Sequence, residues 1–304
     1  MRVGVSLSSS HNVSDAREGA RRMIERAAAS RDAGLDSLFV GDHHNTGPRN
    51  YYQNVPIMGR LLAEWGDRPA GILMLLPLWH PVLAAEQVGT LAAIHRGRFI
   101  LQAAVGPADE QFSGMGVDPR HRPSRLEEAL DAMRRLWAGE TVSGGRRHTF
   151  TDARIAPVPP EPVEVWLGGS APAALDRAAR LCDGWLGDPG LTDIEAHEQA
   201  AAYRAQRRAL GREPGVVAIR RDIYVGANAE EARAVAGPVI AGGYRGFDRS
   251  AVVFGDTDEV AAEFRRLAGM GYTDVIIRHM VPDQAQVLAS TARLARVREL
   301  VADA

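Results

Sequence analysis

Short apolar runs alternate with longer amphipathic stretches along the whole chain. Eight of the runs have the length of strands and are almost continuously hydrophobic, which is typical of strands buried on both faces of a parallel sheet. These predicted strands are Arg2–Leu7, Asp36–Val40, Gly71–Leu76, Phe99–Ala104, Val163–Leu167, Gly184–Gly187, Val216–Val225 and Asp274–His279. The pattern therefore predicts a mainly parallel sheet that is covered on both faces.

The stretches between these runs have the apolar spacing and the end residues of helices. The first begins near Asp15, with Glu18 three residues later as a capping box, and ends at Gly34. The others span Pro81–His95, Pro123–Ala138, Pro172–Leu181, Asp193–Leu210, Ala229–Ile240, Asp256–Ala268 and Asp283–Val301. Eight strands that alternate with helices predict an α/β fold, a (β/α)8 TIM barrel with modest loop insertions. An open doubly wound sheet is the alternative, but no predicted strand leads into a Gly-x-Gly-x-x-Gly turn.

We expect a single domain over residues 1–304, because no low-complexity linker divides the chain. The Gly- and Pro-rich segment Gly139–Pro162 is interpreted as a long loop within it. The N-terminal segment has the pattern of a strand and not of a signal peptide. The longest apolar stretch, Pro69–Trp79, is too short to cross a bilayer. We therefore expect a cytoplasmic protein that does not bind membranes.

The charge composition excludes several kinds of chemistry. All 36 basic residues are arginine, against 38 acidic residues, so the formal net charge is −2. The absence of lysine excludes Schiff-base catalysis and a phosphate-binding loop that ends in Gly-Lys-Ser/Thr. The single cysteine, Cys182, excludes an intrachain disulfide and a Cys-x-x-Cys redox pair. Balanced charge without an isolated basic tract also argues against a nucleic-acid partner.

In a TIM barrel the functional side chains lie on the loops after the C-terminal ends of the strands. This rule selects a few polar segments of the chain. They are Gly41–Asn45 after the second predicted strand, Pro77–Pro81 after the third, Gln102 and Gly106–Glu110 at the end of the fourth, Gly168–Ser170 after the fifth, and Arg278–His279 at the end of the eighth.

The pair His43-His44 first raises the question of a metal site. Adjacent residues on a strand point to opposite faces, and the chain has no His-x-His or His-Glu-x-x-His spacing, so we predict no metal site. Two interpretations remain open. In one, a histidine packs between strand and helix while Asp42 fixes its tautomer. In the other, one imidazole faces the barrel mouth as a general acid or base, and the position after a strand favours this role.

The turn Gly168-Gly169-Ser170 has the features of a phosphate site. Glycines let backbone amides approach a ligand, and Ser170 can cap the helix that Pro172 begins. An ordinary capped turn is the alternative. Without lysine, a bound phosphate needs helix amides, hydroxyls or arginine, and Arg125 could supply a bidentate guanidinium. Aromatic side chains are candidate walls for a planar ligand, although simple packing would also explain them; these are Tyr51, Tyr52, Trp79 and Trp166.

Over nearly its full length the chain resembles the bacterial luciferase-like flavin-dependent monooxygenases. The resemblance rests on the order and spacing of several segments. They are Gly41–His44, Leu76–Pro81, Ala85–Gln87, Gly97–Leu101, Glu110–Phe112, Met115–Val117, Arg125–Leu130, Leu136–Glu140, Val165–Ser170 and Asp183–Trp185.

The resemblance implies a flavin-type cofactor across the barrel mouth. It makes His43 the catalytic imidazole near the flavin ring and places Arg125 and the strand-five turn at the phosphate. The residues expected to contact the cofactor are Asp42, Leu76, Pro77, Gln102, Gly106, Arg125, Gly168, Gly169 and Ser170. Those expected to contact a substrate are His44, Tyr51, Trp79, His80 and Arg278.

Three positions depart from luciferase itself. Val105 stands where luciferase has an arginine, Asp42 where it has a glutamate, and Ala173 where it has a hydroxyl. Phosphate affinity is expected to be weaker as a result. Weaker affinity would suit a diffusible reduced flavin or a cofactor with a different tail.

Three functions follow from the resemblance. The first is a monooxygenase that uses reduced FMN, supplied by a separate flavin reductase, and O2 on a small organic substrate. The second is a hydride-transfer oxidoreductase that uses a deazaflavin, coenzyme F420. The third is a non-catalytic flavin-binding protein. The family also leads us to expect a homodimer, and the mixture of aromatic, His and Arg side chains at the mouth favours an amphipathic substrate.

Overall fold

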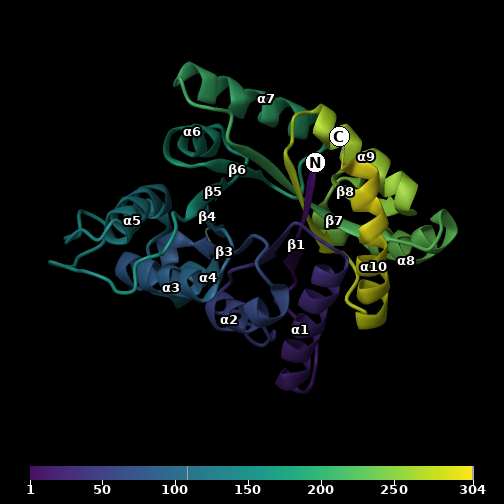
Figure 1. Ribbon diagram of the computed structural model, residues 1–304, viewed down its shortest axis with the longest axis horizontal. Coiled ribbons are helices and arrows are strands. Elements are labelled where there is room, and N and C mark those ends of the chain that lie inside the picture. The colour runs from purple at the N-terminus through teal and green to yellow at the C-terminus, as the bar shows by residue number, and fades with distance from the viewer. Residues whose placement is uncertain (108, 303–304) are drawn as a thin grey trace.

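A closed barrel of parallel strands forms the centre of the protein (Figure 1). The computed structural model describes residues 1–107 and 109–302, so Ala108 of the predicted loop after strand four and the last two residues of the predicted domain lie outside it. The described strands are β1 (Arg2–Leu7), β2 (Ser37–Val40), β3 (Ala70–Leu75), β4 (Phe99–Ala104), β5 (Glu164–Gly168), β6 (Gly184–Gly187), β7 (Val216–Val225), β8 (Val252–Gly255) and β9 (Asp274–His279). They pair in the order β6-β5-β4-β3-β2-β1-β9-β7-β8, and a further pairing of β6 with β7 closes the barrel. The predicted (β/α)8 barrel is confirmed.

Strand β7 changes its partner along its length. Its first residues, Val216–Ile219, pair with β6, whereas Asp222–Val225 pair with β8. Strand β8 therefore extends the sheet beyond the closed wall of the barrel. The sequence does not predict β8, a short run that stands outside the eight strands of the closed barrel.

Helices surround the strands (Figure 1). They are α1 (Ala16–Asp32), α2 (Asn54–Trp65), α3 (Pro81–Ile94), α4 (Glu110–Gly114), α5 (Arg122–Trp137), α6 (Pro172–Leu181), α7 (Asp193–Ala209), α8 (Ala229–Ala241), α9 (Thr257–Gly269) and α10 (Gln284–Val301), with short 3-10 turns η1 (Leu76–Leu78), η2 (Pro119–His121), η3 (Tyr244–Gly246) and η4 (Arg249–Ala251). Helix α2 is absent from the sequence prediction. Its N-cap residue, Gln53, makes no capping hydrogen bond and its first turn contains no acidic residue, so the usual start signals are missing.

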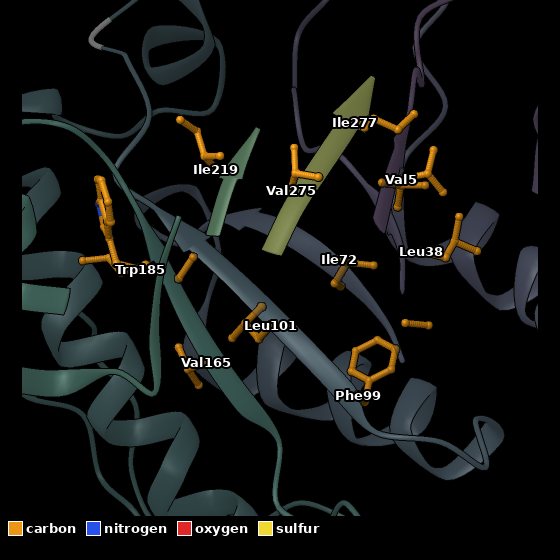
Figure 2. Close-up of a cluster of buried hydrophobic side chains, with 14 of the residues drawn as sticks. Val5, Leu38, Ile72, Phe99, Leu101, Val165, Trp185, Ile219, Val275 and Ile277 are labelled. Carbon is orange, nitrogen blue, oxygen red and sulfur yellow. The ribbon is translucent and has the colours of Figure 1, made fainter. Parts of the chain in front are cut away.

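Alternation along the strands divides the buried side chains into two sets. Those that point outward pack against the helices, and Figure 2 labels several of them, including Val5, Leu101 and Val275. Those that point inward fill the barrel and form a separate cluster: Phe39, Ile100, Trp166, Leu186, Ala218 and Ile276. Side chains on a strand return to the same face every second residue. Gln102, Arg220 and Arg278 therefore follow Ile100, Ala218 and Ile276 on the inner faces of their strands. The inner faces thus change from apolar to polar toward the C-terminal ends of the strands.

The two ends of the described chain meet. The amino group of Met1 donates to the carbonyl of Val301 over 3.4 Å, and Figure 1 shows the N and C labels close together. None of the described helices has the length and apolar character needed to cross a membrane.

Candidate active site at the C-terminal mouth of the barrel

The polar strand ends surround a cavity of about 510 Å³, a size within the usual range of ligand pockets. Its apolar walls come from strands β3, β4, β6 and β9 and consist of Leu73, Leu75, Ala104, Leu186 and Ile276. Polar groups converge on it from the other strands and the loops. The cavity therefore combines apolar walls with a few polar groups, which suits an organic ligand.

His43 borders the cavity, and Gln111 of α4 fixes its orientation. Oε1 of Gln111 accepts from the backbone N–H of His44 over 2.8 Å and lies 3.2 Å from Nδ1 of His43. Nε2 of Gln111 donates to Asp109, whose carboxylate also caps α4. Because Oε1 can only accept, Nδ1 of His43 carries the proton, and Nε2 has a free lone pair.

The surroundings of His43 favour the neutral imidazole. Burial lowers its pKa, and this effect outweighs the opposing effect of the hydrogen bond that its Nδ1–H donates to Gln111. The Tyr51 ring packs edge-on against it, with 5.3 Å between ring centroids. A neutral imidazole with one free nitrogen beside a cavity can accept or return a proton.

Asp42 holds the loop after β2 against the end of β3. Its buried Oδ2 accepts from the backbone N–H of Leu75 over 2.7 Å and from Nε1 of Trp79 over 2.8 Å. Oδ1 lies 3.2 Å from Nε2 of His44, whose ring contacts Trp79. The two histidines thus have different positions, with His43 at the cavity and His44 packed beside Asp42 and Trp79.

Three of the residues expected to contact a substrate are not part of the cavity wall. His44 and Trp79 pack together behind Asp42. His80 packs against Phe150, with 5.4 Å between the ring centroids, on the side of the long loop. Tyr51 and Arg278, the other two, do line the cavity. The position after a strand end selects the loop but does not distinguish side chains that point inward from those that pack behind it.

Arg125 is also directed away from the cavity. Its Nε donates to the carbonyl of Pro77 over 2.9 Å and its Nη1 to the carbonyl of Arg147 over 2.8 Å. The side chain therefore ties the η1 turn to the long loop and does not line the cavity, where the phosphate contact was expected. Leu76 and Pro77 are buried within η1, and their neighbour Leu75 forms the cavity wall instead.

The remaining residues expected at the cofactor gather on one side. Gln102, Gly106, Gly168 and Gly169 line the cavity at the ends of β4 and β5, together with Asp42. The N-cap of α6 is Ala171, so Ser170 does not cap the helix as expected. Its buried hydroxyl, like Nε2 of Gln102, has no hydrogen-bond partner within the described structure. Unpartnered buried donors beside a glycine turn indicate room for the polar groups of a ligand.

Sequence reasoning missed a charged cluster on the opposite side. Arg220 and Arg245 line the cavity together with the expected Arg278, and Asp222 lies directly behind them. Arg220 and Asp222 share the inner face of β7 with Ala218. Two charged residues spaced two apart in a buried strand were the sequence signal that could have indicated this cluster. No comparable pattern marks Arg245 on η3.

Comparison with known proteins agrees with this architecture. The sequence model of the luciferase-like monooxygenases matches residues 1–275. An F420-dependent glucose-6-phosphate dehydrogenase of Nakamurella multipartita is 30% identical over 182 residues, which cover 57% of this chain and 53% of that protein. An F420-dependent hydroxymycolic acid dehydrogenase of Mycobacterium tuberculosis is 28% identical over 243 residues, which cover 76% of this chain and 65% of that protein.

The fold recurs in solved structures. The crystal structure of monooxygenase RslO1 from Streptomyces bottropensis superposes with a TM-score of 0.84 at 20% identity, over 97% of this chain and 98% of that one. The chain spans about half the length of the first curated relatives that it matches. The family match, in contrast, extends over most of the sequence. The chain therefore belongs to the luciferase-like monooxygenase family, whose members are oxidoreductases.

Proposed function

We propose that this protein is a deazaflavin-dependent oxidoreductase that interconverts an alcohol and a carbonyl compound. The observation that carries the proposal is the setting of His43, which lines the cavity with its Nδ1 held by Gln111 and with its pKa lowered by burial. Oxidation of an alcohol requires a group that takes the hydroxyl proton while the carbon loses a hydride. The curated relatives described above are F420-dependent dehydrogenases, which supports the same reaction class.

The residues on the β4–β5 side fit a flavin-type cofactor. Apolar walls suit the faces of a tricyclic ring, and the amide of Gln102 is free to meet its polar edge. The Gly168-Gly169 turn, which lines the cavity, fits a phosphate in a chain without lysine. Ser170 follows this turn outside the cavity wall, and its buried hydroxyl has no partner among the described residues. At Gly169, φ is +141° and an added Cβ would lie 2.9 Å from the Ala174 side chain, so the turn requires glycine.

Each residue then has a defined task. The bound deazaflavin would supply the hydride acceptor or donor. His43 Nε2 would accept the hydroxyl proton during oxidation and return it during reduction. Gln111 would keep Nδ1 protonated, so that the correct nitrogen faces the substrate. Asp42 would hold the backbone at Leu75 and so position the apolar wall.

A monooxygenase that uses reduced FMN is the second candidate. It is favoured by the apolar cavity walls, which would protect a reactive oxygen species from water, and by the description of the matched family. This alternative requires a source of reduced FMN, such as a separate flavin reductase. A non-catalytic flavin-binding role is the third possibility.

Binding and turnover distinguish the three. Purified protein should be titrated with F420 and with FMN, each oxidised and reduced, and then mixed with a panel of alcohols and carbonyl compounds. We expect F420 binding, and loss of turnover by about 100-fold or more in His43→Asn with cofactor affinity unchanged. The exposed His197→Asn on α7 is the matched control. Binding of reduced FMN without F420 would overturn the proposal in favour of the monooxygenase, and binding without His43-dependent turnover would favour the non-catalytic role.

A further inference from the structure

The cavity wall formed by β7, β9 and η3 has an excess of positive charge toward the cavity. Arg220 on β7 and Arg278 on β9 project from two paired strands. In this pairing Asp222 lies opposite Arg278, and Arg245 lines the cavity from η3. Burial and the neighbouring Arg220 lower the pKa of Arg278 to about 10, so it remains protonated at neutral pH. The side chains of Arg220 and Arg278 are largely buried, whereas that of Arg245 is 44% exposed. Positive charges held close together in a largely buried wall are unfavourable unless anions compensate them.

Asp222 compensates only part of this charge. Its carboxylate accepts from Nε of Arg220 over 2.8 Å and from Nη2 over 3.0 Å, a bidentate pair. Oδ2 also accepts from the hydroxyl of Tyr244 over 2.7 Å. Nη1 of Arg245 is 4.0 Å away, at the edge of an ion pair. Asp222 is therefore engaged mainly by Arg220.

Arg278 has no carboxylate of its own among the described residues. Its one hydrogen bond is a long one, 3.3 Å from Nη2 to the carbonyl of Leu7. Its Nε is buried without a partner, and no described carboxylate lies within ion-pair distance of its guanidinium. A buried guanidinium with a free donor is the expected complement of an anionic ligand.

The other two carboxylates of the cavity wall have separate partners. Asp42 accepts from Leu75 and Trp79, and Asp188 accepts from the backbone N–H of Gly190 over 2.8 Å. The described residues therefore leave the positive charge of Arg278 without a carboxylate partner, as a site for a bound anion would require.

Gly41 keeps the space next to Arg278 open. A Cβ at Gly41 would lie 3.0 Å from the Tyr51 hydroxyl and 3.6 Å from Nη2 of Arg278. The Tyr51 ring in turn contacts the His43 ring. An anion on Arg278 would thus sit beside Tyr51 and on the His43 side of the cavity.

From this arrangement we propose that Arg278, assisted by Arg245, binds the carboxylate or phosphate group of an anionic substrate. The inference rests on the proposed function, which assigns the β4–β5 side of the cavity to a flavin-type cofactor. The turn that fits the cofactor phosphate follows β5, and β6 and β7 separate β5 from β9. The anion at Arg278 therefore belongs to the second ligand, a small hydroxy or oxo compound whose charged group is held while its reacting carbon faces His43.

The site can be tested by anion binding, which does not require turnover. Acetate and inorganic phosphate should each be titrated into the cofactor-free protein by calorimetry, in the wild type, Arg278→Gln, Arg278→Lys and Arg245→Gln. The exposed Arg296→Gln on α10 is the matched control. We expect at least one anion to bind the wild type and Arg296→Gln equally, and to bind Arg278→Gln about tenfold or more weakly. Lysine at this position should restore part of the affinity, because it keeps the charge but not the planar donor pair.

The two anions identify the charged group, and further outcomes overturn the proposal. Preference for acetate indicates a carboxylate substrate, and preference for phosphate a phosphate monoester. Binding of neither anion to the wild type, or equal binding to Arg278→Gln, contradicts the proposal. If Arg278→Gln does not fold, the partly exposed Arg245→Gln must show weakened anion binding for the proposal to stand. Equal weakening of F420 and anion binding in Arg278→Gln would assign the site to the cofactor. Arginine-dependent anion binding without any F420 binding would instead leave this site intact and refute the proposed function.

Discussion

The Nδ1 nitrogen of His43 lies 3.2 Å from Oε1 of Gln111, and this contact determines which imidazole nitrogen is available to the cavity. The direction of the contact is not ambiguous, because the same oxygen accepts from the backbone N–H of His44. Gln111 also makes a hydrogen bond to Asp109 and so links His43 to the N-terminus of α4. The proton on His43 is thus located by a side chain 68 residues away in sequence.

Gln111→Glu should raise the pKa of His43. A carboxylate next to the Nδ1–H stabilises the imidazolium, which opposes the burial that lowers the pKa in the wild type. Titration of the His43 ring by NMR would measure the change. Gln111→Leu is the matched variant: it removes the acceptor without adding charge, and its His43 pKa should not rise. An unchanged pKa in Gln111→Glu would show that the side chain does not control this imidazole.

Arg125→Met should reduce stability more than cofactor affinity. The variant keeps the apolar stem but removes the donors to the carbonyls of Pro77 and Arg147, which should lower the free energy of unfolding by about 1–3 kcal/mol. Urea denaturation measures this loss, and a cofactor titration measures the affinity. Ser170→Ala, which removes an unpartnered hydroxyl, should show the reverse pattern. A larger loss of affinity in Arg125→Met than in Ser170→Ala would mean that Arg125 binds the cofactor.

Gly41→Ala should weaken anion binding with little loss of stability. The methyl group would occupy the space between the Tyr51 hydroxyl and the Arg278 guanidinium, while the backbone at this position does not require glycine. We expect several-fold weaker binding in the same calorimetric titration. Gly269→Ala at the end of α9 is the matched control, because an added Cβ there would meet none of the described residues within 4 Å beyond its neighbours in the helix. That control should bind anions normally and gain about 0.5–1 kcal/mol in stability.

Stability should fall between pH 6.5 and about 4 because of buried histidines. Burial lowers the pKa of His279 to about 3 and that of His11 to about 4, from an ordinary value of 6.5. Between these values the unfolded chain binds more protons than the folded one, so the free energy of unfolding rises with pH and levels off above pH 6.5. Urea denaturation across this range measures the slope. The slope should be shallower in His279→Gln, and an equal slope would show that His279 is not responsible.

Much of the fold could be predicted from patterns of neighbouring residues. The continuous apolar runs place all eight barrel strands, because strands buried on both faces need few polar positions. Helix α2 and strand β8 were missed. Helix α2 lacks a capping signal, and β8 lies outside the alternation of eight strands and helices that forms the barrel. Both are stabilised by packing or pairing with segments elsewhere in the chain, as in the pairing of β8 with Asp222–Val225.

For the site, the sequence alone selected loops that border the cavity but did not distinguish the side chains that line it from those that pack behind it. The position after a strand end identifies the segment with His43, because parallel strands all end at one mouth. Whether His43 or His44 faces the cavity depends on Asp42, Gln111 and Trp79, which come from different parts of the chain. Arg125 was assigned to a phosphate by its chemistry, whereas two backbone carbonyls occupy its donors. Only the tertiary structure places Arg220, Arg245 and Arg278 around one cavity. The strength of an ion pair depends on the distance between the charges, so only the folded chain shows that Asp222 pairs with Arg220 and leaves Arg278 without a carboxylate among the described residues.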